Sequence, residues 1–95
     1  MFARYFTFHS TAENRPAIEK VADDIYRHSV TLPGFVSATY VMSDEGTTYG
    51  AFSVWQSRET AEAGGQSIRE KVMPTLQGLL TAPPEVTVME VYEPK

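Results

Sequence analysis

The chain has 95 residues, of which 42% are hydrophobic and 21% are charged, so we expect a single folded domain over residues 1–95 and exclude disordered and collagen-like classes. It has no cysteine, which excludes disulfides, Cys-ligated metal sites and thiol nucleophiles. Its net charge of −4 is spread evenly along the chain, so no basic cluster favours nucleic acid or an anionic membrane as a partner.

The beginning of the chain lacks the apolar core and cleavage site of a secretory signal, so we expect a cytoplasmic protein. A domain of this length buries only about 60–65% of the surface that its unfolded chain exposes, which leaves it marginally stable. Without cysteines, and with two histidines, the usual remaining means of stabilisation is oligomerisation.

The first half of the chain predicts a strand and then a helix. Residues 2–9 are rich in aromatic side chains and alternate loosely, which is typical of a strand. Residues 15–31 place apolar side chains at helical spacing, with Asn14 as the expected N-cap and Pro16 in the first turn. The segment Leu32-Pro33-Gly34 ends this helix.

The second half predicts a hairpin and a second helix. Residues 35–42 and 48–55 are dense in β-branched and aromatic residues, and a short polar segment containing a glycine separates them. Ser57 is the expected N-cap of the helix that follows. Because Gly64-Gly65 and Pro74 interrupt that helix, we expect it to be bent or split into two.

Residues 85–93 form the last predicted strand and complete the order β-α-β-β-α-β. This order indicates an α+β, ferredoxin-like fold, in which a four-stranded antiparallel sheet carries two helices on one face. The predicted strands are apolar on both faces, whereas two helices can cover only one of them. We therefore expect a homodimer in which the sheets of two copies pack together. The alternative is a monomer, whose open face is made polar by four side chains: Ser37, Thr39, Thr48 and Thr87.

Short motifs of the chain resemble the dimeric α+β barrel superfamily. Leu32-Pro33-Gly34-Phe35 leads into the second strand, Val54-Trp55-Gln56-Ser57-Arg58-Glu59 closes the third, and Pro83-Pro84-Glu85-Val86 opens the last. Within this superfamily the chain looks most like antibiotic-biosynthesis-monooxygenase-type domains, and the resemblance covers nearly its whole length. It implies a homodimeric barrel that oxidises a phenolic, quinol or anthrone-type aromatic with O₂ and needs no cofactor.

Haem degradation, which other members of the superfamily perform, is not expected. Those members use an Asn on the first strand and a Trp and a His on the second helix. Residues 2–9 contain no Asn, and Gly64 and Pro74 stand at the corresponding helix positions. A metal site is not expected either, because the two histidines are predicted at opposite ends of the sheet.

The predicted hairpin carries the candidate substrate-binding residues. If Glu45-Gly46 forms a two-residue turn, Tyr40, Tyr49 and Trp55 share one face with small residues, which leaves room for a flat ligand beneath the helices. Arg4 on the first strand is the fourth candidate. The alternative is that these residues belong to the core and that Trp55 only packs at the junction of strand and helix.

The two histidines are the candidate catalytic residues, because the pKa of an imidazole suits proton transfer at neutral pH. His28 borders the apolar side of the first helix and has an alternative role in stabilising the C-terminus of that helix. His9 stands at the end of a strand and is expected to be exposed. Two functions therefore remain: a cofactor-independent monooxygenase, and a non-catalytic dimer that binds a small aromatic molecule or a partner protein.

Overall fold

The computed structural model describes all 95 residues and has the predicted order of strands and helices. The elements are β1 (Phe2–His9), α1 (Arg15–Ser29), β2 (Phe35–Met42), β3 (Thr48–Trp55), α2 (Arg58–Leu76) and β4 (Glu85–Glu90). Two short 3₁₀ helices, η1 (Ala12–Asn14) and η2 (Gln77–Leu79), precede α1 and follow α2. None of the helices combines the length and the apolar character that crossing a membrane requires.

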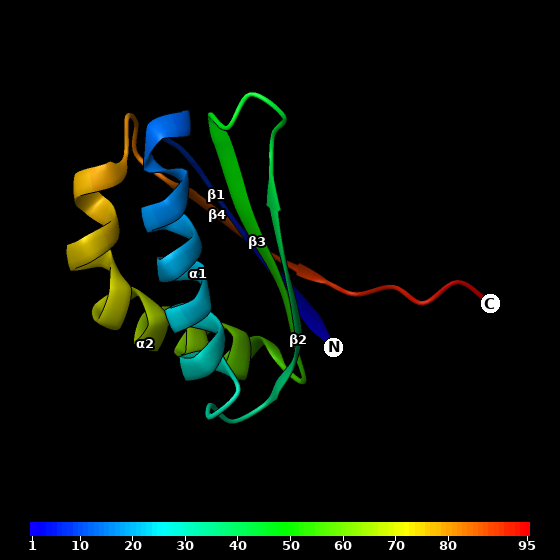
Figure 1. The fold of residues 1–95 in the computed structure, drawn as a ribbon. Coiled ribbons are helices and arrows are strands. Elements are labelled where there is room, and N and C mark those ends of the chain that lie inside the picture. The colour runs from blue at the N-terminus through cyan, green and yellow to red at the C-terminus, as the bar shows by residue number, and fades with distance from the viewer.

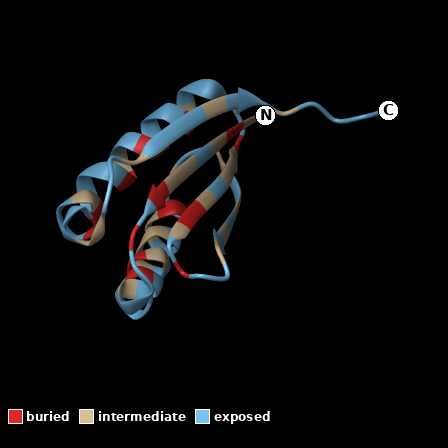
Figure 2. Cartoon of the chain, turned by 90° about the horizontal axis from the view of Figure 1, so that it is seen from above, coloured by how far each residue is buried: buried red, intermediate tan, exposed pale blue.

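The four strands form one antiparallel sheet in the order β2-β3-β1-β4, with both helices on one face (Figure 1). This arrangement confirms the predicted α+β, ferredoxin-like fold. The central pair β1 and β3 is in register along its whole length, from Phe2 opposite Trp55 to His9 opposite Thr48. Buried residues gather between the sheet and the helices, whereas the outer sides of the helices are exposed (Figure 2).

The last strand ends at Glu90, so the prediction that it continues to residue 93 is wrong. Glu90 pairs with Phe2, the first residue of β1, and the Val91 N–H donates to the Met1 carbonyl at 2.9 Å. Beyond this point β1 offers no further residue with which to pair. The tail therefore leaves the sheet (Figure 1), and Tyr92 is 77% exposed.

The ends of the helices agree with the sequence in part. α1 ends at Ser29, two residues before the predicted end. Asn14 stands at the predicted N-cap position, but its side chain makes no capping hydrogen bond and donates to Ser10 Oγ at 3.0 Å. The turn of η1 leads directly into α1, so Asn14 is already helical. The cap at Ser57 is confirmed: its Oγ accepts from the Thr60 N–H, and Thr60 Oγ1 accepts from the Ser57 N–H, both at 3.1 Å.

The second helix is continuous through Gly64-Gly65 and Pro74, but its axis changes direction along its length (Figure 1). Gly64 faces the sheet, where a Cβ would collide with the indole ring of Trp55. Trp55 is fully buried, and its Nε1–H donates to Ser53 Oγ at 2.9 Å. The missing side chain at Gly64 is therefore what allows α2 to lie directly on the largest residue of the core.

The face of the sheet opposite the helices carries exposed apolar side chains. The ring of Tyr5 lies over Gly50 and is 5.9 Å from the ring of Phe52, measured between centroids. Phe52 is 39% exposed, Val41 45% and Met89 44%. No helix or loop of this chain lies over this face of the sheet (Figure 1).

Substituting Gly64 tests the contact with Trp55. Gly64→Ala should lower the free energy of unfolding by about 1–2 kcal/mol, because overpacking against a rigid ring outweighs the helix propensity that alanine adds. Urea unfolding followed by circular dichroism measures this change. The matched control is Gly78→Ala, since a Cβ at Gly78 meets no atom within 4 Å. Equal stability of Gly64→Ala and the unsubstituted protein would contradict this description of the core.

Candidate functional site

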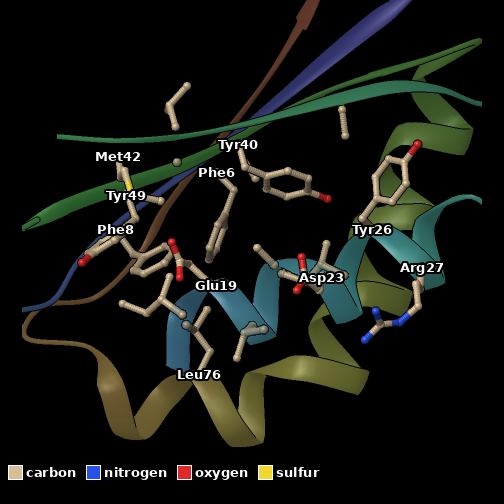
Figure 3. Close-up of a pocket in the computed structure, with 18 residues that line it drawn as sticks. Phe6, Phe8, Glu19, Asp23, Tyr26, Arg27, Tyr40, Met42, Tyr49 and Leu76 are labelled. Atoms are coloured by element: carbon tan, nitrogen blue, oxygen red, sulfur yellow. The ribbon is translucent and has the colours of Figure 1, made fainter. Parts of the chain in front are cut away.

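A cleft of about 740 Å³ separates α1 from the sheet (Figure 3). Its floor contains three small residues, Ala38, Gly50 and Ala51, which are too short to reach the helix above them. Fourteen of its 18 lining residues are hydrophobic. Five aromatic side chains from four elements surround this space: Phe6, Phe8, Tyr26, Tyr40 and Tyr49. The cleft is thus shaped for a flat apolar molecule.

The predicted hairpin register holds, although the turn differs from the one expected. Tyr40 lies opposite Ala51 and Met42 opposite Tyr49, so the aromatic and small residues share the face towards the helices. The Gly46 N–H donates to the Ser43 carbonyl at 2.9 Å, and Gly46 has a φ of 72°. The turn is therefore centred on the two residues before Gly46 and not on Glu45-Gly46.

Tyr49 closes one end of the cleft. Its ring stacks on Phe8 with the centroids 5.4 Å apart, and only 2% of the residue is exposed. The Tyr49 hydroxyl donates to the Gly46 carbonyl at 2.7 Å. Since this hydrogen bond occupies the hydroxyl, Tyr49 offers a ligand mainly its ring.

Tyr40 stands between the sheet and α1, with its hydroxyl pointing towards Tyr26 (Figure 3). The two rings meet edge to face, with centroids 6.5 Å apart. The tyrosine hydroxyl hydrogen bonds of the structure are both made by Tyr49, so the Tyr40 hydroxyl has no partner within the protein. Because no fully buried side-chain oxygen lacks a partner, the Tyr40 hydroxyl is in contact with solvent. Burial, with a further contribution from Tyr26, raises the pKa of Tyr40 to about 12. At neutral pH Tyr40 is therefore an uncharged O–H donor inside an apolar cleft, available to an oxygen atom of a ligand.

Charged side chains of α1 form the rim of the cleft. Glu19, Asp23 and Arg27 line it, and all three are exposed to solvent. Glu19 accepts a hydrogen bond from Arg15 at 3.2 Å, and Arg27 points away from the sheet (Figure 3). No group of three or more His, Asp or Glu side chains comes together in a way that could hold a metal ion.

Neither histidine lines the cleft. His28 faces the second helix, where its Nε2 lies 2.8 Å from Ser67 Oγ and links α1 to α2. His9 is exposed at the end of β1, with its Nδ1 3.3 Å from Thr48 Oγ1. The assignment of either residue as a catalytic base stays a prediction.

The other predicted binding residues are divided between the cleft and the core. Tyr40 and Tyr49 lie in the cleft. Trp55 lies beneath α2 and lines neither the cleft nor a smaller inner cavity next to the cleft. Arg4 lines that inner cavity, which has a volume of about 40 Å³ and which Tyr40 also borders. Their roles in binding a substrate stay predictions.

Sequence reasoning did not select three of the aromatic side chains that line the cleft. Phe6 and Phe8 could have been found, because they occupy alternate positions of β1 and so share a face. Tyr26 carries no such signal: it flanks the apolar side of α1, and only the packing of that helix turns its ring towards the cleft.

No protein-family model matches the chain, and a search of curated proteins finds none that matches. Among solved structures, the monooxygenase ActVA-Orf6 of Streptomyces coelicolor, in complex with nanaomycin D, is 24% identical with a TM-score of 0.79, over 99% of this chain and 89% of that one. Rv0793 of Mycobacterium tuberculosis is 21% identical with a TM-score of 0.82, over 98% and 96% of the two chains.

SnoaB, a cofactor-independent oxygenase of Streptomyces nogalater, is 17% identical with a TM-score of 0.77, over 98% of this chain and 95% of its own. These likenesses show the fold. They confirm the resemblance to antibiotic-biosynthesis-monooxygenase-type domains at that level.

The burial of Tyr40 predicts that its hydroxyl loses its proton at a higher pH than an ordinary tyrosine does. A spectrophotometric titration of phenolate absorbance should lose a step near pH 12 in Tyr40→Phe, since the ordinary value for tyrosine is 10.0. Between these two values the folded state keeps a proton that the unfolded chain has lost, so stability should fall as the pH rises through this interval. If the step that disappears lies near pH 10, the Tyr40 hydroxyl is not in an apolar cleft.

Proposed function

We propose that this chain binds a flat, electron-rich aromatic molecule in the cleft and oxidises it with O₂ without a cofactor. The observation that carries the proposal is the aromatic cleft itself, with the unoccupied hydroxyl of Tyr40 inside it. The fold supports it as well, because it is shared with a monooxygenase and with a cofactor-independent oxygenase.

In such a reaction the substrate supplies the electrons. A phenolic or anthrone-type substrate loses a proton, and the resulting anion reduces O₂. For an anthrone, the CH₂ between two aromatic rings becomes a carbonyl, so that one oxygen atom of O₂ enters the product and the other leaves as water. The protein has two tasks: it shields the anion from water, and it stabilises the oxyanion through the Tyr40 O–H.

The base that removes the proton is proposed to be His28 or His9. His9 stands at the end of β1, whereas His28 belongs to α1, the helix that covers the cleft. The His28 ring contacts Ser67 in this structure, so it reaches the cleft only by turning or through a water molecule. His9 stays the second candidate.

Oxygen uptake with a panel of anthrones and naphthohydroquinones tests this function. Tyr40→Phe should lower kcat by about 100-fold, as expected for the loss of one oxyanion donor. His28→Ala should lower kcat by about 100-fold or more if His28 is the base, and His9→Ala should then have no effect. Tyr92→Phe, in the exposed tail, is the control for Tyr40→Phe. Uptake at the same rate with and without the protein would refute the oxygenase proposal.

The second candidate function is non-catalytic binding of a small aromatic molecule. One observation favours it, namely that no histidine lines the cleft. The two functions differ in the fate of the bound ligand. A binding protein would return the ligand unchanged in air, whereas an oxygenase would release an oxidised product.

We also propose that the chain forms a homodimer through the open face of the sheet. The support is the exposed apolar surface of Tyr5, Val41, Phe52 and Met89, which the helices leave uncovered. A second copy related by two-fold symmetry would place this surface against itself and remove it from water.

Light scattering at micromolar concentration measures the assembly. The expected mass is twice the 10.6 kDa of one chain. Phe52→Glu should reduce the mass to that of one chain, because it would bury a carboxylate in an apolar interface. Val30→Glu is the matched control, since Val30 is 50% exposed at the end of α1 and away from this face. A mass of 10.6 kDa for the unsubstituted protein would exclude the homodimer.

A further inference from the structure

Next to the cleft lies the inner cavity of about 40 Å³ between the sheet and the two helices. Six residues line both spaces and so form the wall between them: Phe6, Ile25, Ala38, Tyr40, Ala51 and Leu76. One water molecule needs about 10–15 Å³ by the same measure, so the cavity has room for a group of a few atoms. It therefore admits a small planar group but not an aromatic ring. Arg4 and Arg69 line it, and they are its only charged residues.

Packing holds Arg4 in place. It projects from the central strand β1 towards α2 and lies against Gly65, where a Cβ would be 2.8 Å from the guanidinium carbon. The same guanidinium carbon is 5.7 Å from the centroid of the Phe6 ring. The absence of a side chain at Gly65 thus provides the space that the guanidinium occupies.

Neither Arg4 nor Arg69 forms an ion pair with a carboxylate. The three ion pairs of the structure join other residues: Arg15 with Glu19, Arg27 with Asp24, and Arg58 with Glu62. Partial burial lowers the pKa of Arg4, and the positive charge of Arg69 lowers it further. Two guanidinium groups that form no ion pair therefore face the same small cavity.

Carboxylates stand outside the inner cavity on both sides and none stands within it. On the outer side, Arg4 and Arg69 border an open groove of about 460 Å³ that Glu62 and Glu70 also line. On the other side, Glu19 and Asp23 stand at the rim of the cleft together with Arg27. The remaining lining of the inner cavity is apolar or hydroxylic, with no negative charge.

We infer that Arg4 and Arg69 bind a carboxylate attached to the aromatic ligand, so that the substrate class is aromatic carboxylic acids. This inference rests on the proposed function, because it places the ring in the cleft beside Tyr40 and the carboxylate in the inner cavity. The planar fork of a guanidinium matches a carboxylate through two parallel hydrogen bonds. Arg4, the less exposed of the two arginines, provides the main contact.

Isothermal titration with 3-hydroxy-2-naphthoic acid and its amide tests the inference, because the two probes differ only in the charged group. The protein should bind the acid at least tenfold more tightly than the amide. Arg4→Met should weaken binding of the acid at least tenfold and change the amide by less than twofold. Gly65→Ala, which displaces Arg4 without removing its charge, should also weaken binding of the acid alone. Arg58→Met is the control, since Arg58 lies over the Phe2 ring and outside the cavity.

Two results would overturn the inference in distinguishable ways. Equal affinity for the acid and the amide, or an equal loss of both in Arg4→Met, would refute the carboxylate site and leave the aromatic cleft in place. Failure to bind the acid, the amide and 2-naphthol alike would refute the proposed ligand class as well. If circular dichroism shows that Arg4→Met does not fold, Arg69→Met decides in its place, because Arg69 is exposed and its removal does not disturb the core.

Discussion

The contact between Trp55 and Gly64 sets how closely the second helix packs on the sheet, and the position of the first helix depends on that packing. α2 lies directly on the indole ring, so this part of the interface is filled. α1 is linked to α2 through His28 and Ser67, but it lies over the small residues of β2 and β3. Because Ala38, Gly50 and Ala51 leave a gap among the larger side chains of the sheet, the space under α1 stays open. Both helices contribute side chains to the core, but the cleft lies under α1.

The order of polar groups along the cleft gives it a direction. Carboxylates of α1 lie at the rim, the neutral phenol of Tyr40 stands inside, and the guanidinium of Arg4 lies in the neighbouring inner cavity that Tyr40 also borders. Aromatic walls alone do not favour one orientation of a ligand that has an apolar ring. These three polar groups would impose one, because each accepts a different charge or hydrogen-bonding partner.

The fold could be predicted from the sequence because the signals for its strands and helices are local. Runs of β-branched and aromatic residues mark the strands, and Ser57 begins α2 through hydrogen bonds to a residue three positions away. The end of β4 was not predictable in this way, because it depends on where β1 begins. At the site, Tyr49 and Trp55 have the same parity on β3 and look equivalent in the sequence. Only the position of Gly64 on another element decides that one faces the cleft and the other is covered.

Gly50 lies on the boundary between the two surfaces for which functions are proposed. Its backbone forms part of the cleft floor, and the rings and methyl groups of the open face approach it from the opposite side, with Val41 Cγ2 and Tyr5 Cε1 nearest. Only the main chain at Gly50 would therefore separate a ligand in the cleft from a second copy on the open face of the sheet. Any free-energy coupling between the two events must be reciprocal: a ligand that tightens assembly is itself held more tightly by the assembled form. Ligand affinity in this protein would then depend on protein concentration.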